Sequence, residues 1–304
     1  LNFEPSWQFW IDVGGTFTDC LGLGAGGRQL RHKVLSNGVT KGITAPGSDR
    51  LSIVDATRRN DPADYWRGFQ LVLFDPLGKI VDRARVAEGP VANGCLRLET
   101  PLAEIPRVGQ SYELVSKLDA PILAIRWVLG LAADAPLPRV SVRLGTTRGT
   151  NALLTRQGAE TALITTRGFG DLLRIGNQER PRLFELNIQK PASLFSHVVE
   201  VDERVGSDGV IQRALDERRV LQQLRDLGPH RVSSLAVCLM NSYRNPQHER
   251  AIGRLARQVG FDEISLSHEV VPLVKMISRG DTTVVDAYLN PVLRQYVDRL
   301  RQAL

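Results

Sequence analysis

Residues 11–19 read Ile-Asp-Val-Gly-Gly-Thr-Phe-Thr-Asp, and this stretch determines how the start of the chain folds. An apolar run leads into the carboxylate of Asp12, a Gly-Gly pair follows, and a second carboxylate, Asp19, precedes another apolar run. The pattern predicts a strand, a tight turn and a second strand. Glycines at 14 and 15 permit a positive φ and let a ligand approach the backbone closely. We therefore expect a β-hairpin whose turn can contact a ligand.

The groups around this turn suit a phosphate-bearing ligand. Thr16 and Thr18 supply hydroxyls, and exposed N–H groups of a turn can hold phosphate oxygens. Asp12 is a hard oxygen ligand suited to Mg²⁺, which prefers a carboxylate together with waters and substrate phosphates. The alternative is an ordinary Gly-Gly hairpin, since short motifs often occur by chance. The stretch is not a Walker A loop, because no Gly-Lys-Ser/Thr follows, nor a Rossmann fingerprint, because no helix opens after the glycines.

Composition and charge are those of a globular protein. The chain has 304 residues, of which 42% are hydrophobic and 24% charged, and is long enough for two ordinary domains. The net charge is +6, but basic and acidic residues alternate, so we interpret the excess as a solvated surface and expect no nucleic-acid partner. Cys20, Cys95 and Cys238 lack metal-site spacing and indicate free thiols in a reducing compartment. With no membrane-length apolar stretch and no signal peptide, we expect a cytoplasmic protein without a membrane partner.

Apolar alternation and turn residues predict three parts along the chain, in an α/β fold. Residues 1–46 form an opening β-meander that carries the turn, and residues 47–119 form a β-rich insertion, with a loop over 36–60. Residues 120–304 alternate strands and helices, which is typical of α/β layers with a largely parallel sheet. The expected strands are 8–13, 17–23, 29–35, 69–74, 79–84, 95–98, 112–115, 140–144, 161–166, 234–240 and 263–267, and the expected helices are 121–131, 149–157, 215–227, 246–259 and 282–304.

Polar loops after two of the expected strands are further candidates for binding. Thr146 and Thr147 precede a helix, and a helix N-terminus presents free N–H groups to an anion. The alternative there is N-capping by Thr147 or Thr150. Arg167 follows the next strand and can pair with a carboxylate or phosphate, although a solvated arginine in a turn is the simpler explanation. His268 fits a catalytic base, but a lone histidine is more often structural.

Taken together and in this order, these segments resemble the N-terminal half of the hydantoinase A / 5-oxoprolinase family. The resemblance covers about residues 1–46 and 120–304 and leaves 47–119 outside it. This sequence departs from the family pattern at Arg148-Gly149, where Val-Ala is common, and at Thr155, where Glu is common. The matching segments are residues 10–19, 145–147, 150–154, 166–169, 171–176, 201–205, 234–243, 248–249, 279–280 and 286–291.

The resemblance implies an actin-like (ribonuclease H-like) ATPase half with a small β-rich insertion. Members of the family use ATP and Mg²⁺ to activate a lactam, hydantoin or ketone carbonyl. The chain is then the N-terminal ATP-binding portion of an ATP-dependent cyclic-amide hydrolase of the 5-oxoprolinase or hydantoinase type. Actin-like ATPases close around the nucleotide with a second half, and we see only one Gly-Gly-Thr loop. We therefore expect a truncated chain that lacks the second half and is inactive alone.

The resemblance also implies roles for individual residues. Arg167 and Arg279 are candidates for binding a carboxylate or phosphate of the substrate. Asp12 is the candidate metal ligand. The candidates for catalysis are Asp12, Asp19, Thr147 and Asn151, and those for binding ATP are Asp12, Gly14, Gly15, Thr16, Thr18 and Thr146.

Other functions remain open on the sequence. One is the ATPase subunit of a ketone carboxylase of the same family, and another is a non-catalytic actin-like module that docks a partner through the β-rich insertion. The pI of about 9.5 is the sole feature that suggests a nucleic-acid binder. The resemblance implies a lactam or hydantoin substrate and a hydantoinase B-type subunit or fused domain, in a homo- or hetero-oligomer.

Overall fold

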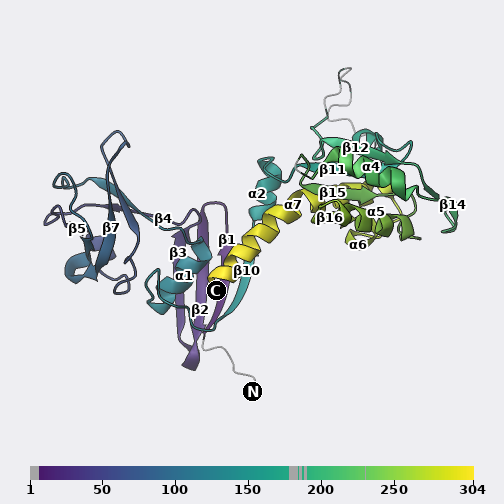
Figure 1. Cartoon of the computed structure of the whole chain (residues 1–304). Helices are drawn as coiled ribbons and strands as arrows, with labels where there is room; N and C mark the ends of the chain where they lie inside the picture. Colours follow the sequence, from purple (N-terminus) through teal and green to yellow (C-terminus); the bar gives the residue numbers. More distant parts are fainter. Residues whose placement is uncertain (1–6, 178–183, 185–186, 188–189, 230) are drawn as a thin grey trace. The chain divides into compact units, whose positions relative to one another are not determined.

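The computed structural model describes residues 7–177, 184, 187, 190–229 and 231–304, and the chain divides into two compact units (Figure 1). The first unit contains Leu1–Arg148 and Val297–Leu304, and the second contains Gly149–Tyr296. Each unit has its own sheets and its own hydrophobic cores. No helix among the described residues has the length and apolar character needed to span a membrane.

The first unit opens with a four-stranded sheet in the order β10-β1-β2-β3. β1, β2 and β3 pair antiparallel as a meander, and β10 adds to β1 in parallel, which confirms the predicted meander. The strands of this sheet are β1 (Trp7–Val13), β2 (Phe17–Gly24), β3 (Gln29–Leu35) and β10 (Ser141–Thr146).

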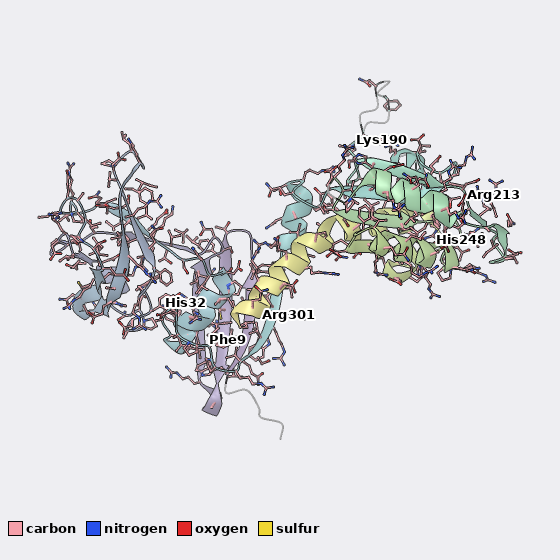
Figure 2. All side chains as sticks on the ribbon, in the orientation of Figure 1. Phe9, His32, Lys190, Arg213, His248 and Arg301 are labelled. Atoms are coloured by element: carbon pink, nitrogen blue, oxygen red, sulfur yellow. The ribbon has the colours of Figure 1, made fainter. Side chains whose placement is uncertain are left out.

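Strict alternation in β1 gives this sheet one covered face and one open face. Phe9 (Figure 2), Ile11 and Val13 are buried, together with residues of α1 (Ala120–Leu129). Trp10 and Asp12 point to the opposite face and are exposed. Successive side chains of a strand alternate between the faces of a sheet, so burying the apolar set against α1 places Asp12 on the open face.

The β-rich part of the first unit is a six-stranded antiparallel sheet in the order β4-β9-β6-β7-β8-β5. Its core includes Leu71, Leu96 and Leu114, each fully buried. The prediction of loop over 36–60 was wrong, because β4 and β5 lie there. Both are short and form only by pairing with distant strands, β9 and β8. The strands are β4 (Val39–Ile43), β5 (Ser52–Val54), β6 (Gln70–Phe74), β7 (Ile80–Val91), β8 (Cys95–Leu98) and β9 (Ser111–Val115). The boundaries 1–46, 47–119 and 120–304 stay a prediction.

The second unit is built on a parallel sheet in the order β12-β11-β15-β16, as the alternation of strands and helices predicted. Every residue of β11 and β15 is buried, which is typical of central strands covered on both faces. Ile164, Val237 and Ile252 belong to one core cluster, and Leu163, Ala236 and Val284 belong to another, so the two faces are covered separately. The strands are β11 (Thr161–Thr166), β12 (His197–Val201), β15 (Ser234–Cys238) and β16 (Glu263–Leu266).

Helices of the second unit supply the outer layers. Residues of α4 and α5 join the first of these clusters, and residues of α7 join the second. The last helix begins at Met276 rather than at 282, and β12 was not predicted. The helices are α2 (Arg148–Leu154), α3 (Leu172–Ile175), α4 (Glu217–Leu227), α5 (Gln247–Gln258), α6 (Ser267–Val270) and α7 (Met276–Ala303), and a small hairpin joins β13 (Arg204–Val205) to β14 (Ile211–Arg213).

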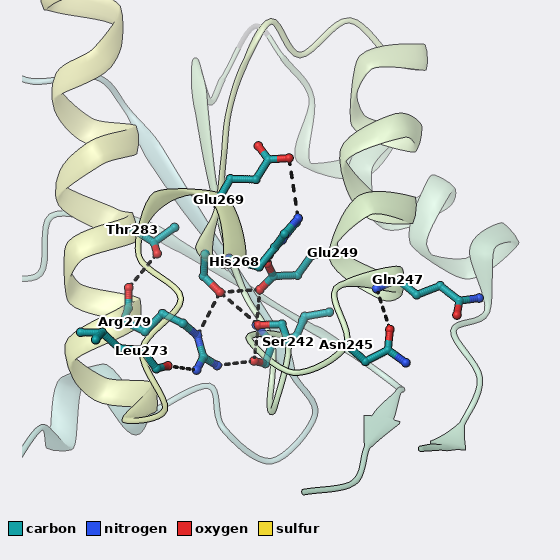
Figure 3. Close-up of polar contacts among 11 residues, drawn as sticks. Ser242, Asn245, Gln247, Glu249, His268, Glu269, Leu273, Arg279 and Thr283 are labelled. Carbon is teal, nitrogen blue, oxygen red and sulfur yellow. Dashed lines mark hydrogen bonds and ion pairs between the residues drawn. The ribbon is translucent and has the colours of Figure 1, made fainter. Parts of the chain in front are cut away.

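A buried polar network lies where β15 and β16 end (Figure 3). Glu249 accepts hydrogen bonds from Ser267 Oγ at 2.6 Å, His268 Nδ1 at 2.6 Å and Leu239 N at 2.9 Å. Burial alone raises the pKa of a carboxyl group, but these hydrogen bonds outweigh it and lower the pKa of Glu249. His268 is therefore held by a buried carboxylate. This contact fits a structural histidine, the alternative to a catalytic base that the sequence left open. Ser267 Oγ also accepts a bond from Arg279 Nε at 3.0 Å.

Arg279 is fully buried, and its guanidinium joins the loops that follow β15 and β16. It donates to Leu239 O and Leu273 O, both at 2.6 Å, besides Ser267 Oγ. A buried charge of this kind is tolerated because each of the three guanidinium nitrogens donates to an acceptor. The network therefore fixes the start of α7 to the ends of two strands.

Arg279→Met is expected to lower the free energy of unfolding by about 2–4 kcal/mol, because it removes the hydrogen bonds of a fully buried guanidinium, and a hydrogen bond to a charged group contributes about 1.5–3 kcal/mol. Arg294→Met is the matched control on the same helix, since Arg294 is exposed and makes a surface ion pair with Glu263 at 3.3 Å. Its cost is expected to stay below about 1 kcal/mol. Urea unfolding followed by circular dichroism measures both variants. Equal costs would show that the Arg279 network contributes nothing beyond a surface pair.

Candidate functional site

The turn between β1 and β2 is held by a backbone bond from Gly14 N to Phe17 O at 2.9 Å. Gly15 and Thr16 are exposed at its tip. A Cβ on Gly14 would lie 2.9 Å from Phe17 O, closer than real Cβ atoms come to backbone, so glycine is required there for space. Glycine permits a positive φ, but neither Gly14 nor Gly15 adopts one. The motif thus encodes a close backbone approach rather than a left-handed turn.

Two exposed carboxylates flank the turn. Asp12 and Asp19 are directly opposite each other in the antiparallel register, on the open face of the sheet. Asp19 forms an ion pair with Lys33 at 3.1 Å. In the described part of the chain Asp12 forms no ion pair, so its carboxylate is available to a cation from solution. Like charges opposite each other on a sheet are unfavourable, and a bound cation would relieve this.

A cavity of about 820 Å³ lies over this face, entirely within the first unit. It combines the two carboxylates with the basic side chains of Arg31, Lys33 and Arg143. The guanidinium of Arg143 lies 5.1 Å from the ring centroid of Trp10, an arrangement typical of a cation–π contact. The cavity therefore offers an acidic position for a metal ion and basic positions for an anion.

Whether Asp12 can hold Mg²⁺ depends on the donor groups around it. Among the described residues, no group of three or more His, Cys, Asp and Glu side chains gathers into a site that could hold a metal ion by itself. Mg²⁺ keeps several waters and is commonly bound by one or two carboxylates plus substrate phosphates. Asp12 fits that pattern, since its carboxylate is exposed at the tip of β1 beside the turn.

The loop after β10 lies beside the turn. Gly145 is the register partner of Asp12, and Thr147 N donates to Val13 O at 3.1 Å. Thr146 is exposed, and its hydroxyl accepts a bond at 3.1 Å from the backbone N of Arg148, the first residue of α2. The structure therefore brings Thr146 and Thr147 to the same end of the sheet as Asp12.

Thr18 is placed differently from the exposed residues of the turn. Its side chain is fully buried, and its hydroxyl lies 3.0 Å from Ser36 Oγ. Ser36 also donates to Gly14 O at 2.8 Å. The sequence interpretation missed Ser36, although the meander itself supplied the signal: Ser36 follows β3 directly, and β3 pairs with the strand that leaves the turn.

The remaining candidates belong to the second unit. Asn151 lies on α2, where its carbonyl accepts bonds from Thr155 N and Oγ1. Arg167 is exposed, and its guanidinium lies 4.0 Å from Asp202. The amides of the loop that follows Arg167 already hold a carboxylate oxygen, because Gly168 N and Gly170 N both donate to Glu200 Oε1, at 3.0 and 2.8 Å. The loop thus leaves these two amides no open position for a ligand.

Arg279 does not lie at an open surface. It is fully buried, and its donors are committed to the network of Figure 3. A substrate cannot reach a guanidinium in this state without disrupting the network. The family resemblance implied a binding role for Arg279, but it did not reveal that the side chain is buried.

Comparison with known proteins assigns the family. Residues 101–260 match the model described as the hydantoinase/oxoprolinase N-terminal region. The chain belongs to this family. It is 40% identical over 232 residues to 5-oxoprolinase 1 of Arabidopsis thaliana, a match that covers 64% of this chain and 18% of the relative. The chain thus spans less than a fifth of that protein's length.

Two solved structures share the fold of this family member. A nucleotide-free acetone carboxylase, described as carboxylating acetone in an ATP-dependent way, matches with a TM-score of 0.60 and 18% identity, over 99% of this chain and 34% of that chain. An ATP-dependent caprolactamase from Pseudomonas jessenii matches with a TM-score of 0.53 and 22% identity, over 97% and 33%. These matches show that the chain shares its fold with both proteins, and its own strands and helices confirm the predicted α/β fold class.

Gly14→Ala is expected to lower the free energy of unfolding by about 1–3 kcal/mol, the usual cost of forcing atoms into filled space. Gly145→Ala is the control on the neighbouring strand, because the nearest atom to its added Cβ would be Asp12 Oδ1 at 3.8 Å, an ordinary contact. Its effect is expected to stay within about 0.5 kcal/mol. Thermal and urea unfolding measure both. A tolerated Gly14→Ala would show that the turn is not as tight as the structure describes.

Proposed function

We propose that the chain forms the N-terminal ATP-binding portion of an ATP-dependent cyclic-amide hydrolase of the 5-oxoprolinase or hydantoinase type. The proposal rests mainly on the exposed turn beside Asp12. The carboxylate of Asp12 forms no ion pair with the described residues. Membership of the family and a relative named 5-oxoprolinase support the reaction class. The structural neighbour named ATP-dependent caprolactamase supports the use of ATP on a cyclic amide.

In this proposal, residues at one end of the first sheet bind the nucleotide phosphates. Asp12 holds Mg²⁺, and the turn at Gly14, Gly15 and Thr16 receives phosphate oxygens through backbone N–H groups and a hydroxyl. Thr146 lies at the same end of the sheet and adds a second hydroxyl. Thr18 acts from below the turn, through its bond to Ser36, rather than as a direct ligand.

Asp19 and Lys33 form a charged pair next to the metal position. The Lys33 ammonium keeps Asp19 from adding a second uncompensated negative charge beside Asp12. We propose that Asp19 and Thr147 act with Asp12 in orienting the reacting groups. Asn151, on α2 of the second unit, stays a candidate for catalysis in its own right.

ATP, when bound, supplies a phosphoryl group that activates the stable amide carbonyl toward water. The chain's own contribution is positioning and charge stabilisation, which account for most of the catalysis in phosphoryl transfer. Its residues hold the phosphates, place the metal and exclude alternative orientations. Ring opening itself is then a property of the complete enzyme, with a B-type subunit or domain as the proposed partner.

A ketone carboxylase is the second candidate, because the acetone carboxylase structure matches the chain with a TM-score of 0.60. Both candidates use the same nucleotide-binding residues and differ in the substrate that is activated. A non-catalytic docking module is a third possibility and predicts no effect of the turn residues on activity.

Asp12→Asn is expected to weaken Mg-ATP binding to this chain at least 10-fold and to remove its dependence on Mg²⁺, because a neutral amide is a poor ligand for that ion. Asp134→Asn is the matched control, since Asp134 is an exposed carboxylate of the same unit that pairs with Arg67 at 3.5 Å. Titration by NMR, with and without Mg²⁺, measures both variants. Unchanged binding by Asp12→Asn would remove the metal role. Micromolar affinity with turnover would instead contradict the view that this chain is half of the cleft.

The substrate class is tested with a full-length protein that contains this chain, together with its B-type partner where that is separate. Phosphate release from ATP is expected to rise strongly with 5-oxoproline, with glutamate as product. Stimulation by a ketone and bicarbonate instead would select the carboxylase. ATP hydrolysis stimulated by neither would direct the search to hydantoins and other lactams. No hydrolysis under any condition would favour the docking module.

A further inference from the structure

Ser36, in the loop that follows β3, forms three hydrogen bonds with the turn proposed to bind phosphate. Its backbone N donates to Thr16 O at 2.8 Å, and its hydroxyl donates to Gly14 O at 2.8 Å. The same hydroxyl oxygen lies 3.0 Å from Thr18 Oγ1. One residue therefore contacts the start, the tip and the end of the turn, although it is 22 residues away from Gly14 in sequence.

The direction of these bonds follows from counting donors. A serine hydroxyl has one hydrogen to donate, and that of Ser36 is committed to Gly14 O. The bond between the two hydroxyls must then be donated by Thr18. Thr18 is fully buried, so its hydroxyl needs a partner in the protein, and Ser36 supplies it. Removing the Ser36 hydroxyl would leave both the Gly14 carbonyl and the Thr18 hydroxyl without this partner.

The bond to Gly14 O also sets the direction of the next N–H group. The C=O and N–H groups of a trans peptide point in opposite directions, and the peptide that joins Gly14 to Gly15 is trans. Because the Gly14 carbonyl faces Ser36, the Gly15 N–H faces away from it. No acceptor in the described structure takes a hydrogen bond from that N–H. Ser36 therefore holds an unpaired donor in a fixed direction at the exposed tip of the turn.

We infer that Ser36 is a positioning residue for nucleotide phosphate binding, acting through the Gly14 carbonyl and the Gly15 N–H. This inference rests on the proposed function of the turn. A preorganised N–H group binds an anion better than one that must first be ordered, because the ordering cost is already met in the folded chain. Ser36 does not need to touch the nucleotide for this effect.

The test compares Ser36→Ala, Ser36→Thr and a control, Ser48→Ala, by titrating each with Mg-ATP and following the amide signals of Gly15 and Thr16. Ser48 matches Ser36 closely, because it is also half-buried, donates to a carbonyl (Ala45 O, 2.9 Å) and accepts a bond (from Val54 N, 2.9 Å). Ser36→Ala is expected to raise the Kd about 10-fold, the factor given by one or two lost neutral hydrogen bonds. Ser36→Thr keeps the hydroxyl and is expected to restore binding. Ser48→Ala is expected to lower the melting temperature as much as Ser36→Ala and to leave the Kd unchanged.

Two different failures can be told apart. A folded wild-type chain that binds no Mg-ATP overturns the proposed function and, with it, this inference. Wild-type binding that depends on Asp12, combined with an unchanged Kd in Ser36→Ala, overturns the inference alone and leaves Ser36 a merely structural serine. Equal Kd increases in Ser36→Ala and Ser48→Ala also overturn it, because the effect would then follow stability rather than the turn.

Discussion

The site depends on the position of β1 between an antiparallel and a parallel neighbour. β2 fixes Asp12 opposite Asp19, and β10 fixes Asp12 beside Gly145. A shift of one residue in either pairing would turn Asp12 into the core and bring Ile11 to the surface. Burial of Phe9, Ile11 and Val13 opposes that shift, so the hydrophobic core beneath the sheet sets the geometry of the charged groups above it.

The carboxylates beside the turn of the first unit and two glutamates of the second unit lie in opposite environments. The first unit leaves carboxylates exposed at the tip of a hairpin, where a ligand can replace the solvent. The second unit buries Glu203 and Glu249 and satisfies each with a histidine, His248 (Figure 2) at 2.7 Å and His268 at 2.6 Å. Thr166 donates a further bond to Glu203. Buried carboxylates with complete partners hold neighbouring loops together, whereas exposed ones remain available for chemistry.

How far the sequence could predict this structure depended on the distance between interacting residues. The hairpin at 11–19, the meander and the parallel sheet follow local patterns of apolar residues and turns, and all were predicted. β4 and β5 form only through distant partners and were expected as loop. The family resemblance suggested Arg279 as a ligand, because a sequence shows the type of a residue but not its burial. Ser36 was missed for a related reason, because it follows β3 in the chain while its three bonds reach residues 14–18, at the turn between β1 and β2.

The loop after β11 carries a consequence for selectivity. Its Gly168 and Gly170 amides bind Glu200, which belongs to the same chain and is always nearby. A tethered group competes at an effective concentration on the order of millimolar or higher, so a free anion of ordinary affinity does not displace it. Both amides are therefore occupied by a carboxylate of the chain itself. A glycine-rich loop that resembles an anion site in sequence thus offers neither of these two amides to a free phosphate.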